Sequence, residues 1–287
     1  VACRGQTVSP AAATVRFGHL VFFDKAVLTI DGRESCASCH NPDPRFGWSD
    51  GRKVAVGRTG ATGAGLGLLG VRNTKSLVDC WRLEKRPCNS DGRAPNMLAQ
   101  CLQAVTDPLV LAMPSINAAV VRINEKRVYR DLAAMAWKTD GIVEANLREA
   151  LVAFLVTIRS SDMPADRLAA GLPVSLPEAA LRGWVVFKAH CVECHVPETG
   201  WRDFKYHNIG IASRSRSSDT GRGLISGVAA DNYKFLTPGL AEVAKHGPYM
   251  HDGSLATLGD VVGFFQFGGH FTLPPSKTVL RDPGIDP

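Results

Sequence analysis

Two copies of one five-residue motif, Cys-x-x-Cys-His, constrain this chain of 287 residues more than any other feature. The first copy occupies residues 36–40 and the second occupies residues 191–195. Each copy follows a segment rich in apolar and aromatic residues, Leu20–Phe23 in the first half and Trp184–Phe187 in the second. This repetition predicts two related domains, each built around one motif.

The motif itself is the attachment signature of c-type haem. Two intervening residues let both sulfurs reach the two vinyl groups of one porphyrin, and the histidine then lies under the iron as its ligand. A thioredoxin-like redox pair does not need the following histidine, and a four-cysteine zinc site would leave both histidines without a role. We therefore expect two covalently bound haems c, held by Cys36, Cys39 and His40 and by Cys191, Cys194 and His195.

The cysteines also bear on the compartment. Attachment of two haems c takes place outside the cytoplasm, so we expect a periplasmic protein. Four further cysteines, Cys3, Cys80, Cys88 and Cys101, form an even number, which favours two disulfides in an oxidising compartment. Cys80 with Cys88 would close a short loop and Cys3 with Cys101 would follow, although sequence alone does not determine the pairing. Small residues before Cys3 also resemble the end of a lipoprotein signal, so a lipid anchor there is the alternative to a disulfide.

Apolar residues recur with helical spacing, and no alternating pattern is long enough to predict a large sheet. The expected helices cover residues 129–137, 144–160 and 178–190, together with one that Ser115 caps. The glycine-rich segment 52–70 is expected to be a loop, and the proline-punctuated segment 163–177 a linker. The predicted fold class is therefore mainly α, with long loops.

Charge and hydropathy exclude some classes of partner. The net charge of +6 is mild and favours docking to an acidic surface, such as that of a redox partner protein. The densest basic stretch, residues 214–222, lacks aromatic stacking residues, so we expect no nucleic acid partner. No apolar run approaches the ~18 residues that a membrane span needs, so we expect no transmembrane segment.

Beyond the two motifs, a series of short stretches resembles the bacterial di-haem cytochrome c peroxidases and their MauG-like relatives. The similarity runs from about His19 to Gly269, in the family's order. The stretches are His19–Asp24, Ser35–His40, Gly70–Leu77, Asp91–Arg93, His207–Gly210, Asp219–Arg222, Phe235–Pro238 and Gly247–Gly253. The resemblance implies two cytochrome c-like domains, at residues 1–163 and 164–287, with one covalently attached haem in each.

The same resemblance implies different roles for the two haems. The N-terminal haem would meet hydrogen peroxide, and the C-terminal haem would receive or relay electrons. A calcium ion would lie between them, and its ligands by position are Asn73 and the backbone carbonyls of His246 and Pro248, all oxygen donors. Gln100 matches a glutamine of the family's active site and is the candidate catalytic residue.

The chain departs from the family pattern around the first haem. Peroxidase members place a histidine over that iron, but no histidine occurs between Gly51 and Leu77, which predicts an open iron. The family's acid-base glutamate falls at Val110, and Gln100 cannot replace it because an amide has no useful pKa. The tryptophan that lies between the haems of relatives is Ser90.

The second haem shows one further departure. The distal ligand of relatives, Met or Tyr, falls at Phe265, whose side chain cannot bind iron. Either that iron is also open, or another residue binds it, with Met250, His251 and His270 as candidates.

These patterns favour a periplasmic di-haem oxidoreductase that reacts with hydrogen peroxide, either to remove it or to oxidise a partner protein. Losing the acid-base group lowers the rate expected for such an enzyme by ~10²–10⁴-fold. The first alternative is therefore a di-haem electron-transfer cytochrome without peroxidase activity. The second is a gas sensor or a subunit of a larger complex.

Overall fold

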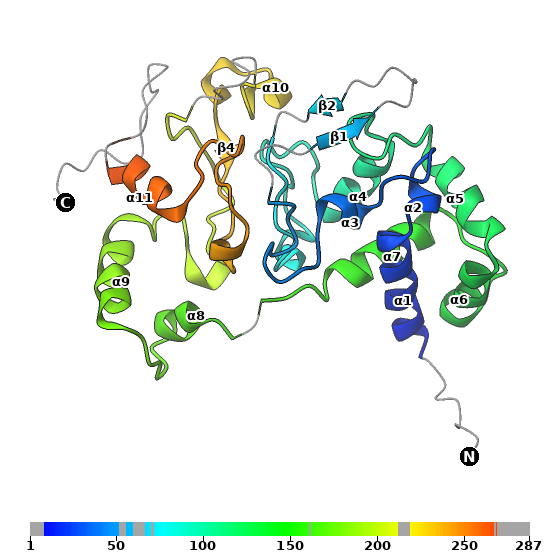
Figure 1. Ribbon diagram of the computed structural model, residues 1–287, viewed down its shortest axis with the longest axis horizontal. Coiled ribbons are helices and arrows are strands. Elements are labelled where there is room, and N and C mark those ends of the chain that lie inside the picture. The colour runs from blue at the N-terminus through cyan, green and yellow to red at the C-terminus, as the bar shows by residue number, and fades with distance from the viewer. Residues whose placement is uncertain are drawn as a thin grey trace.

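The computed structural model describes residues 9–51, 56–59, 67–69, 72–160, 162–211, 219–266 and 268. Most of its regular structure is helical (Figure 1), as predicted. The longer helices are α1 (Pro10–Phe23), α4 (Met97–Thr106), α5 (Ile116–Glu125), α6 (Arg127–Trp137), α7 (Glu144–Leu155), α9 (Glu178–His190) and α11 (Leu258–Gln266). Shorter elements are α2 (Lys25–Leu28), α3 (Cys36–Cys39), α8 (Pro164–Ala169), α10 (Gly223–Ser226), and four strands, β1 (Val56–Thr59), β2 (Gly67–Leu69), β3 (Tyr206–His207) and β4 (Phe235–Leu236).

The main apolar core lies in the first half of the chain, where α1 packs against α6 and α7. Gly18 allows α1 and α7 to approach closely, because a Cβ at this position would lie 1.9 Å from the Ala150 carbonyl oxygen. The Phe17 ring is tilted against Tyr129 and meets Trp137 edge to face, with ring centroids 5.2 and 5.3 Å apart, and these contacts add to the burial of the large side chains. Helix α1 of this bundle also contacts α3, the helix that contains the first motif.

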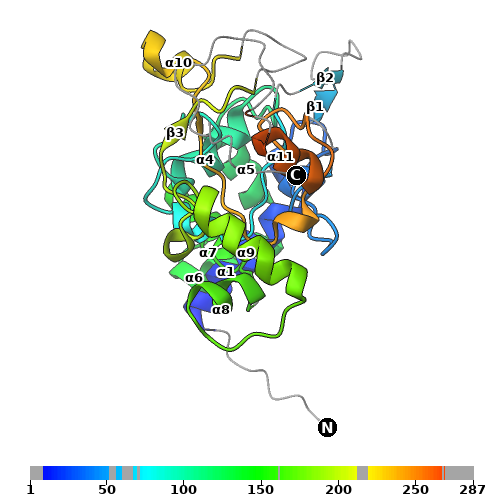
Figure 2. The same cartoon turned by 90° about the vertical axis from the view of Figure 1, so that its left-hand side faces the viewer.

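The second half has fewer buried side chains and more loop. In Figure 1 the helices α8, α9 and α11 lie at the end of the molecule opposite α1, and α10 lies at the top near the middle; Figure 2 views the molecule from the end that holds α9. None of the described side chains of α9 is buried, and its Val185 is 63% exposed. The loop that follows α9 contains Trp201, whose carbonyl oxygen lies 2.8 Å from the Nδ1 of His195 in the second motif.

The predicted helices are confirmed, with small differences in their ends. The side chain of Ser115 accepts a hydrogen bond from the Ala118 amide at 3.1 Å, which caps α5. The helix that carries the second motif has the predicted bounds, Glu178–His190. The helix expected over 144–160 ends at Leu155, since the amides of residues 157 and 158 bond three residues back and tighten the turn.

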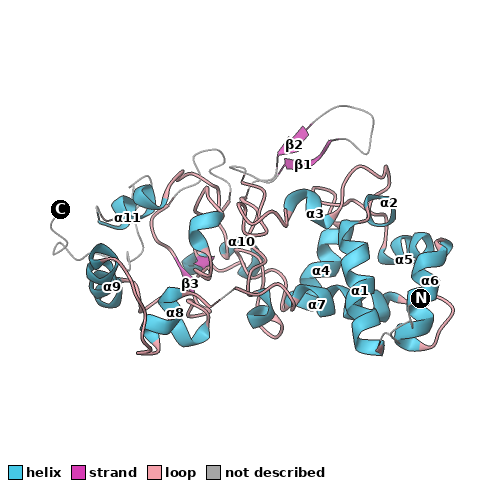
Figure 3. Ribbon diagram, turned by 60° about the horizontal axis from the view of Figure 1, so that its bottom comes forward, coloured by secondary structure: helices cyan, strands magenta, loops and turns pink. Residues whose placement is uncertain are grey.

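One prediction about a loop is wrong, and the expected linker has a feature that was not predicted. The linker expected at 163–177 contains the short helix α8, which begins at Pro164, a residue well suited to the first turn of a helix. The glycine-rich segment 52–70, expected to be loop, contains an antiparallel pair of strands, β1 and β2, with Val56 opposite Leu69 (Figure 3). Backbone pairing forms this hairpin without the alternating apolar side chains that would reveal a strand in the sequence.

The predicted Cys80–Cys88 disulfide is also wrong, because both residues carry free thiols. The Cys80 sulfur lies 3.4 Å from the Leu155 carbonyl oxygen, and the Cys88 sulfur lies 3.4 Å from that of Arg86. Burial raises the pKa of each thiol to about 12. Cys101 is a free thiol as well, and its predicted partner, Cys3, lies outside the described residues.

The predicted lack of a membrane-spanning helix agrees with the structure. Among the described residues, no helix combines the length and the apolar character that crossing a bilayer requires.

Candidate functional site

The first Cys-x-x-Cys-His motif forms a single helical turn. Ser35 precedes α3, and its amide donates a hydrogen bond to the Ser38 hydroxyl at 3.0 Å, which closes a reciprocal cap. The helical turn places Cys36 and Cys39 on one side, since residues three apart are neighbours on a helix. The turn ends at His40, whose amide bonds the Cys36 carbonyl at 2.9 Å.

His40 is held by a residue outside the motif. Its Nδ1 lies 3.1 Å from the backbone carbonyl oxygen of Trp48, which leaves Nε2 as the nitrogen available to a metal. Burial lowers the pKa of His40, and this effect outweighs the opposing hydrogen bond to Trp48. The imidazole is therefore neutral at physiological pH, as a metal ligand must be.

The second motif is built in the same way at the end of α9. The Cys191 amide bonds the Phe187 carbonyl at 2.8 Å, and the His195 amide bonds the Cys191 carbonyl at 2.9 Å. The Nδ1 of His195 lies 2.8 Å from the Trp201 carbonyl oxygen, again leaving Nε2 available. Burial lowers the pKa of His195, as it does in the first motif. Each motif thus offers two thiols and a neutral, oriented imidazole, the donor set that covalent haem requires.

The two supporting loops share a short pattern that the sequence analysis did not include. Both contain Gly-Trp-x-Asp, at residues 47–50 and 200–203. Trp48 and Trp201 have left-handed backbones, with φ of 60° and 63°, which turns each carbonyl towards its histidine. Such a conformation is unfavourable for a bulky residue and persists only where surrounding contacts enforce it. The repeated Gly-Trp-x-Asp is the signal that could have predicted this element.

The side chains of the two tryptophans are anchored differently. Trp48 packs into an aromatic cluster, with its ring centroid 5.9 Å from Phe22 and 6.1 Å from Phe154. Trp201 also packs against an aromatic ring, with its centroid 5.7 Å from that of Phe187, and in addition donates its indole N–H to the Asp166 carboxylate of α8 at 2.8 Å. Aromatic packing therefore positions both tryptophans, and only the second has an added hydrogen bond to a carboxylate.

A carboxylate and a histidine lie against the second motif. The Asp203 carboxylate lies 2.7 Å from the Nε2 of His207, and that nitrogen lies 3.8 Å from the Cys194 sulfur. These ligand atoms all lie within 4.8 Å of one another, which would suit a metal ion. Because Cys194 is one of the cysteines predicted to attach haem, this group lies within the predicted second haem site.

The structure brings together two of the three residues predicted to bind calcium. Asn73 and Pro248 meet across 175 positions of sequence: the amide nitrogen of the Asn73 side chain contacts the Pro248 carbonyl, and its backbone N–H donates to the His251 carbonyl at 2.7 Å. The side-chain oxygen of Asn73 is buried and has no hydrogen-bond partner. A buried oxygen without a partner beside a backbone carbonyl fits a hard cation. His246 lies two residues before Pro248, and no contact places its carbonyl in this group.

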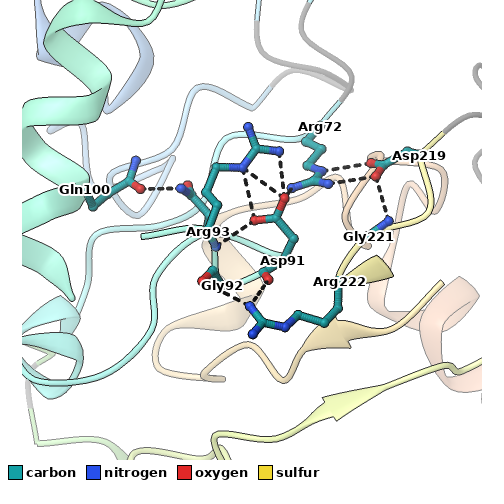
Figure 4. A network of polar contacts seen from close by, with 9 residues as sticks. Arg72, Asp91, Gly92, Arg93, Gln100, Asp219, Gly221 and Arg222 are labelled. Carbon is teal, nitrogen blue, oxygen red and sulfur yellow. Dashed lines mark hydrogen bonds and ion pairs between the residues drawn. The ribbon is translucent and has the colours of Figure 1, made fainter. Parts of the chain in front are cut away.

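Gln100, the predicted catalytic residue, lies on α4, and its side chain forms a hydrogen bond with a neighbouring loop. Its side-chain oxygen accepts a hydrogen bond from the amide of Asn89, so only its own NH₂ group remains to donate (Figure 4). Asn89 belongs to the loop that leads into Asp91 and Gly92. The position of Gln100 therefore depends on that loop.

An ionic network joins this loop to the second half of the chain (Figure 4). Arg72 bonds the Asp219 carboxylate through two nitrogens, at 2.8 and 2.7 Å, and lies 2.7 Å from an oxygen of Asp91. Arg222 donates from the other side to the backbone carbonyl of Asp91 at 3.2 Å. Burial alone would raise the pKa of Asp91, but its bonds to Arg93 and the charge of Arg72 outweigh burial and lower it.

The three positions that depart from the family pattern have different surroundings. Ser90 is buried, and its carbonyl accepts the Leu236 amide at 2.7 Å. Val110 lies in the turn after α4 and is 40% exposed, so it presents an apolar group. Phe265 lies on α11, with its ring centroid 5.3 Å from that of Phe264.

Met250, His251 and His270, the candidates for the distal ligand of the second iron, have different surroundings. The His251 ring stacks on Phe235, with centroids 3.8 Å apart, and its Nε2 is buried without a hydrogen-bond partner. Met250 has a left-handed backbone, with φ of 72°. His270 lies outside the described residues.

Comparisons with known proteins agree with this arrangement. The family model described as di-haem cytochrome c peroxidase matches residues 12–172. The methylamine utilization protein MauG of Methylorubrum extorquens is 35% identical over 262 residues, which cover 89% of this chain and 69% of that protein. MauG of Methylophilus methylotrophus is 33% identical over 257 residues, covering 87% and 71%. A solved structure, that of a MauG-like protein associated with microbial copper homeostasis, superposes with a TM-score of 0.78 at 26% identity, covering 94% of this chain and 82% of that one.

Proposed function

This chain belongs to the di-haem cytochrome c peroxidase family, and from that premise we propose that it is a periplasmic enzyme that reduces hydrogen peroxide at its N-terminal haem. The observation that carries the proposal is the pair of histidines, His40 and His195, each oriented by a tryptophan carbonyl at the end of an attachment motif. We assign one haem to residues 1–163 and the other to residues 164–287.

The residues around each motif have separate tasks in this proposal. When bound, haem iron would supply the redox chemistry for reducing peroxide to water, a reaction that consumes two electrons and two protons. His40 would bind the first iron through Nε2 while Trp48 fixes its orientation. Gln100 would orient peroxide by donating from its NH₂ group, because its oxygen is held by Asn89. His195 would bind the second iron, through which electrons enter from a partner protein or leave it.

Calcium is part of the proposal. We assign the side-chain oxygen of Asn73 and the Pro248 carbonyl as ligands, with the His246 carbonyl as the third protein ligand, because the Asn73 oxygen is buried without a partner. Chelation should lower the melting temperature of the holoprotein, and added Ca²⁺ should restore it. Asn73→Ala should remove this response to Ca²⁺, while an Asn208→Ala control should keep it. A wild-type melting temperature that chelation leaves unchanged would contradict the assignment.

Mixing the purified holoprotein with hydrogen peroxide in a stopped-flow spectrometer tests the main proposal. We expect the Soret band to change and a reduced small-molecule donor to be consumed, in proportion to the peroxide added. Gln100→Leu should slow the spectral change, because it removes the hydrogen bond that orients peroxide. If peroxide leaves the spectrum unchanged and no donor is consumed, the proposed activity is wrong.

One observation favours a second candidate function, electron transfer between partner proteins. Gln100 has no useful pKa, and the position of the family's acid-base glutamate holds the half-exposed Val110. Val110→Glu distinguishes the two candidates. An enzyme limited by proton transfer should react faster with this carboxylate, whereas an electron-transfer protein should show no reaction with either residue.

A further inference from the structure

Two guanidinium groups lie together between the second motif and the loop that contains Trp81. Arg202 directly follows Trp201 and is only 7% exposed. Arg82 lies against Gly200: a Cβ added there would lie 2.2 Å from the Arg82 Cδ. The two side chains are close enough for the charge of Arg82 to contribute to lowering the pKa of Arg202, after the larger effect of burial.

Both side chains occupy positions that glycines leave open. A Cβ at Gly239 would lie 2.0 Å from an Nη of Arg202, and Gly200, with φ of 78°, leaves the room for Arg82. Arg82 also stacks over the Trp81 ring at 4.5 Å. The backbone is therefore shaped to hold two guanidinium groups in fixed places.

Neither guanidinium has the counter-ion that such a position requires. Among the described residues, no carboxylate lies within 4.0 Å of the Arg202 or Arg82 side-chain nitrogens, and the Nε of Arg82 is buried without a hydrogen-bond partner. Asp79 is near enough for its charge to act on Arg202, but its carboxylate accepts a hydrogen bond from the Ser160 hydroxyl at 2.6 Å instead of pairing with either arginine. Burying a cation without a partner is costly, so this pair needs an anion.

We propose that Arg202 and Arg82 form a binding site for a carboxylate, one of the two propionates of the haem attached at Cys191 and Cys194. The planar fork of arginine matches a carboxylate with two parallel hydrogen bonds. The second haem is the source because Arg202 directly follows Trp201, whose carbonyl oxygen lies 2.8 Å from the Nδ1 of His195. This inference rests on the proposed attachment of that haem.

Arg202→Gln in the holoprotein tests the site by spectroelectrochemical titration of both haems. Removing a cation beside the haem favours its more positive, oxidised state. At a fixed potential we expect the ratio of oxidised to reduced second haem to rise by about tenfold, the size of effect that one nearby unit charge has at an effective dielectric constant of about 20. Arg202→Lys should recover part of the shift, and Arg82→Gln should shift the ratio in the same direction if Arg202→Gln does not fold.

Arg182→Gln is the matched control, because it removes the same charge from an arginine of α9 whose side chain is 67% exposed. It should leave both haems unchanged. Replacing chloride with acetate at constant ionic strength should also have no effect, since the carboxylate is already supplied. The assignment is wrong if the ratio of oxidised to reduced haem changes only for the first haem, or if Arg202→Gln and Arg182→Gln change it equally. It is also wrong if acetate as a free ligand changes the ratio. If the second haem is not attached at Cys191 and Cys194, a haemochrome assay of the wild-type protein would show that it is missing. This result is different from an altered redox ratio and so separates the two proposals.

Discussion

Gly92 shows how one residue allows the two halves of the molecule to meet. It has a left-handed backbone, with φ of 67°, and a Cβ there would lie 1.8 Å from the Tyr206 hydroxyl oxygen. Its neighbour Asp91 is the acid at the centre of the ionic network. Two separate requirements, a left-handed backbone and close approach of another side chain, therefore coincide at this glycine.

Gly92→Ala should reduce the free energy of unfolding more than backbone strain alone explains. Gly171 separates the two effects, because it has the same φ of 67° but a Cβ added there would meet no heavy atom within 4 Å. We expect Gly171→Ala to cost about 1–2 kcal/mol from the left-handed backbone and Gly92→Ala to cost measurably more. Urea denaturation of both variants provides the comparison, and equal losses would show that Tyr206 moves aside freely.

At the scale of elements, the short helix α8 supports the second motif from a distance. Its Asp166 accepts the indole N–H of Trp201 at 2.8 Å, and the carbonyl of that tryptophan holds His195 at 2.8 Å. Asp166 is thus a positioning residue, which acts on the histidine through Trp201. No equivalent charged group anchors Trp48 among its described contacts, where phenylalanine rings perform this task.

Asp166→Ala should alter the second haem and leave the first unchanged. Without its anchor, the Trp201 carbonyl should bind His195 less uniformly, which broadens the low-temperature EPR signal of that haem. Asp166→Asn keeps an acceptor oxygen and should restore the narrow signal. Asp162→Ala is the control, because this nearby acid is 70% exposed and pairs with Arg167. Equal broadening in both alanine variants would argue against a specific role for Asp166.

At the scale of the whole molecule, Arg72 holds the two halves together. It reaches Asp91 in the first half and Asp219 in the second, carboxylates whose side chains are 0% and 3% exposed. Burial would raise the pKa of Asp219, but its hydrogen bonds and the charge of Arg72 lower it below the usual value. The pKa of Asp91 is lowered for similar reasons.

These lowered pKa values predict how stability depends on pH. Carboxyl groups with a lower pKa in the folded state stabilise it above their unfolded pKa of about 3.9, and this contribution is lost as the pH falls towards the folded value. We therefore expect the free energy of unfolding to decrease below about pH 4, measured by urea denaturation across pH 3–7.

Arg72→Met should remove much of this contribution. It leaves two buried carboxylates without their shared partner, so we expect a loss of about 3–5 kcal/mol at pH 7 and a weaker decrease below pH 4. Arg45→Met removes the same charge from a pair whose arginine is 79% exposed, and it should cost much less stability than Arg72→Met because water already screens an exposed pair. Similar losses in the two variants would show that the network does not join the halves.

The local parts of this protein were predictable from its sequence. Cys-x-x-Cys-His repeats, the Ser115 cap and the bounds of α9 all depend on residues within one or two helical turns of each other, and short-range geometry follows from residue type. The β1–β2 hairpin and the helix α8 were missed because backbone pairing and a proline start leave little periodicity in the side chains.

The tertiary structure decided the features that depend on burial and on distant partners. Spacing along the sequence could not predict that left-handed tryptophans support both histidines or that Asn73 meets Pro248. Nor could it predict two neighbouring arginines that pair with no carboxylate among the residues the structure describes. The sequence alone determined that two haem-attachment motifs exist, because their chemistry lies within five residues. Which groups surround them was decided by packing, since the cost of a buried charge or carbonyl depends on what the whole fold places beside it.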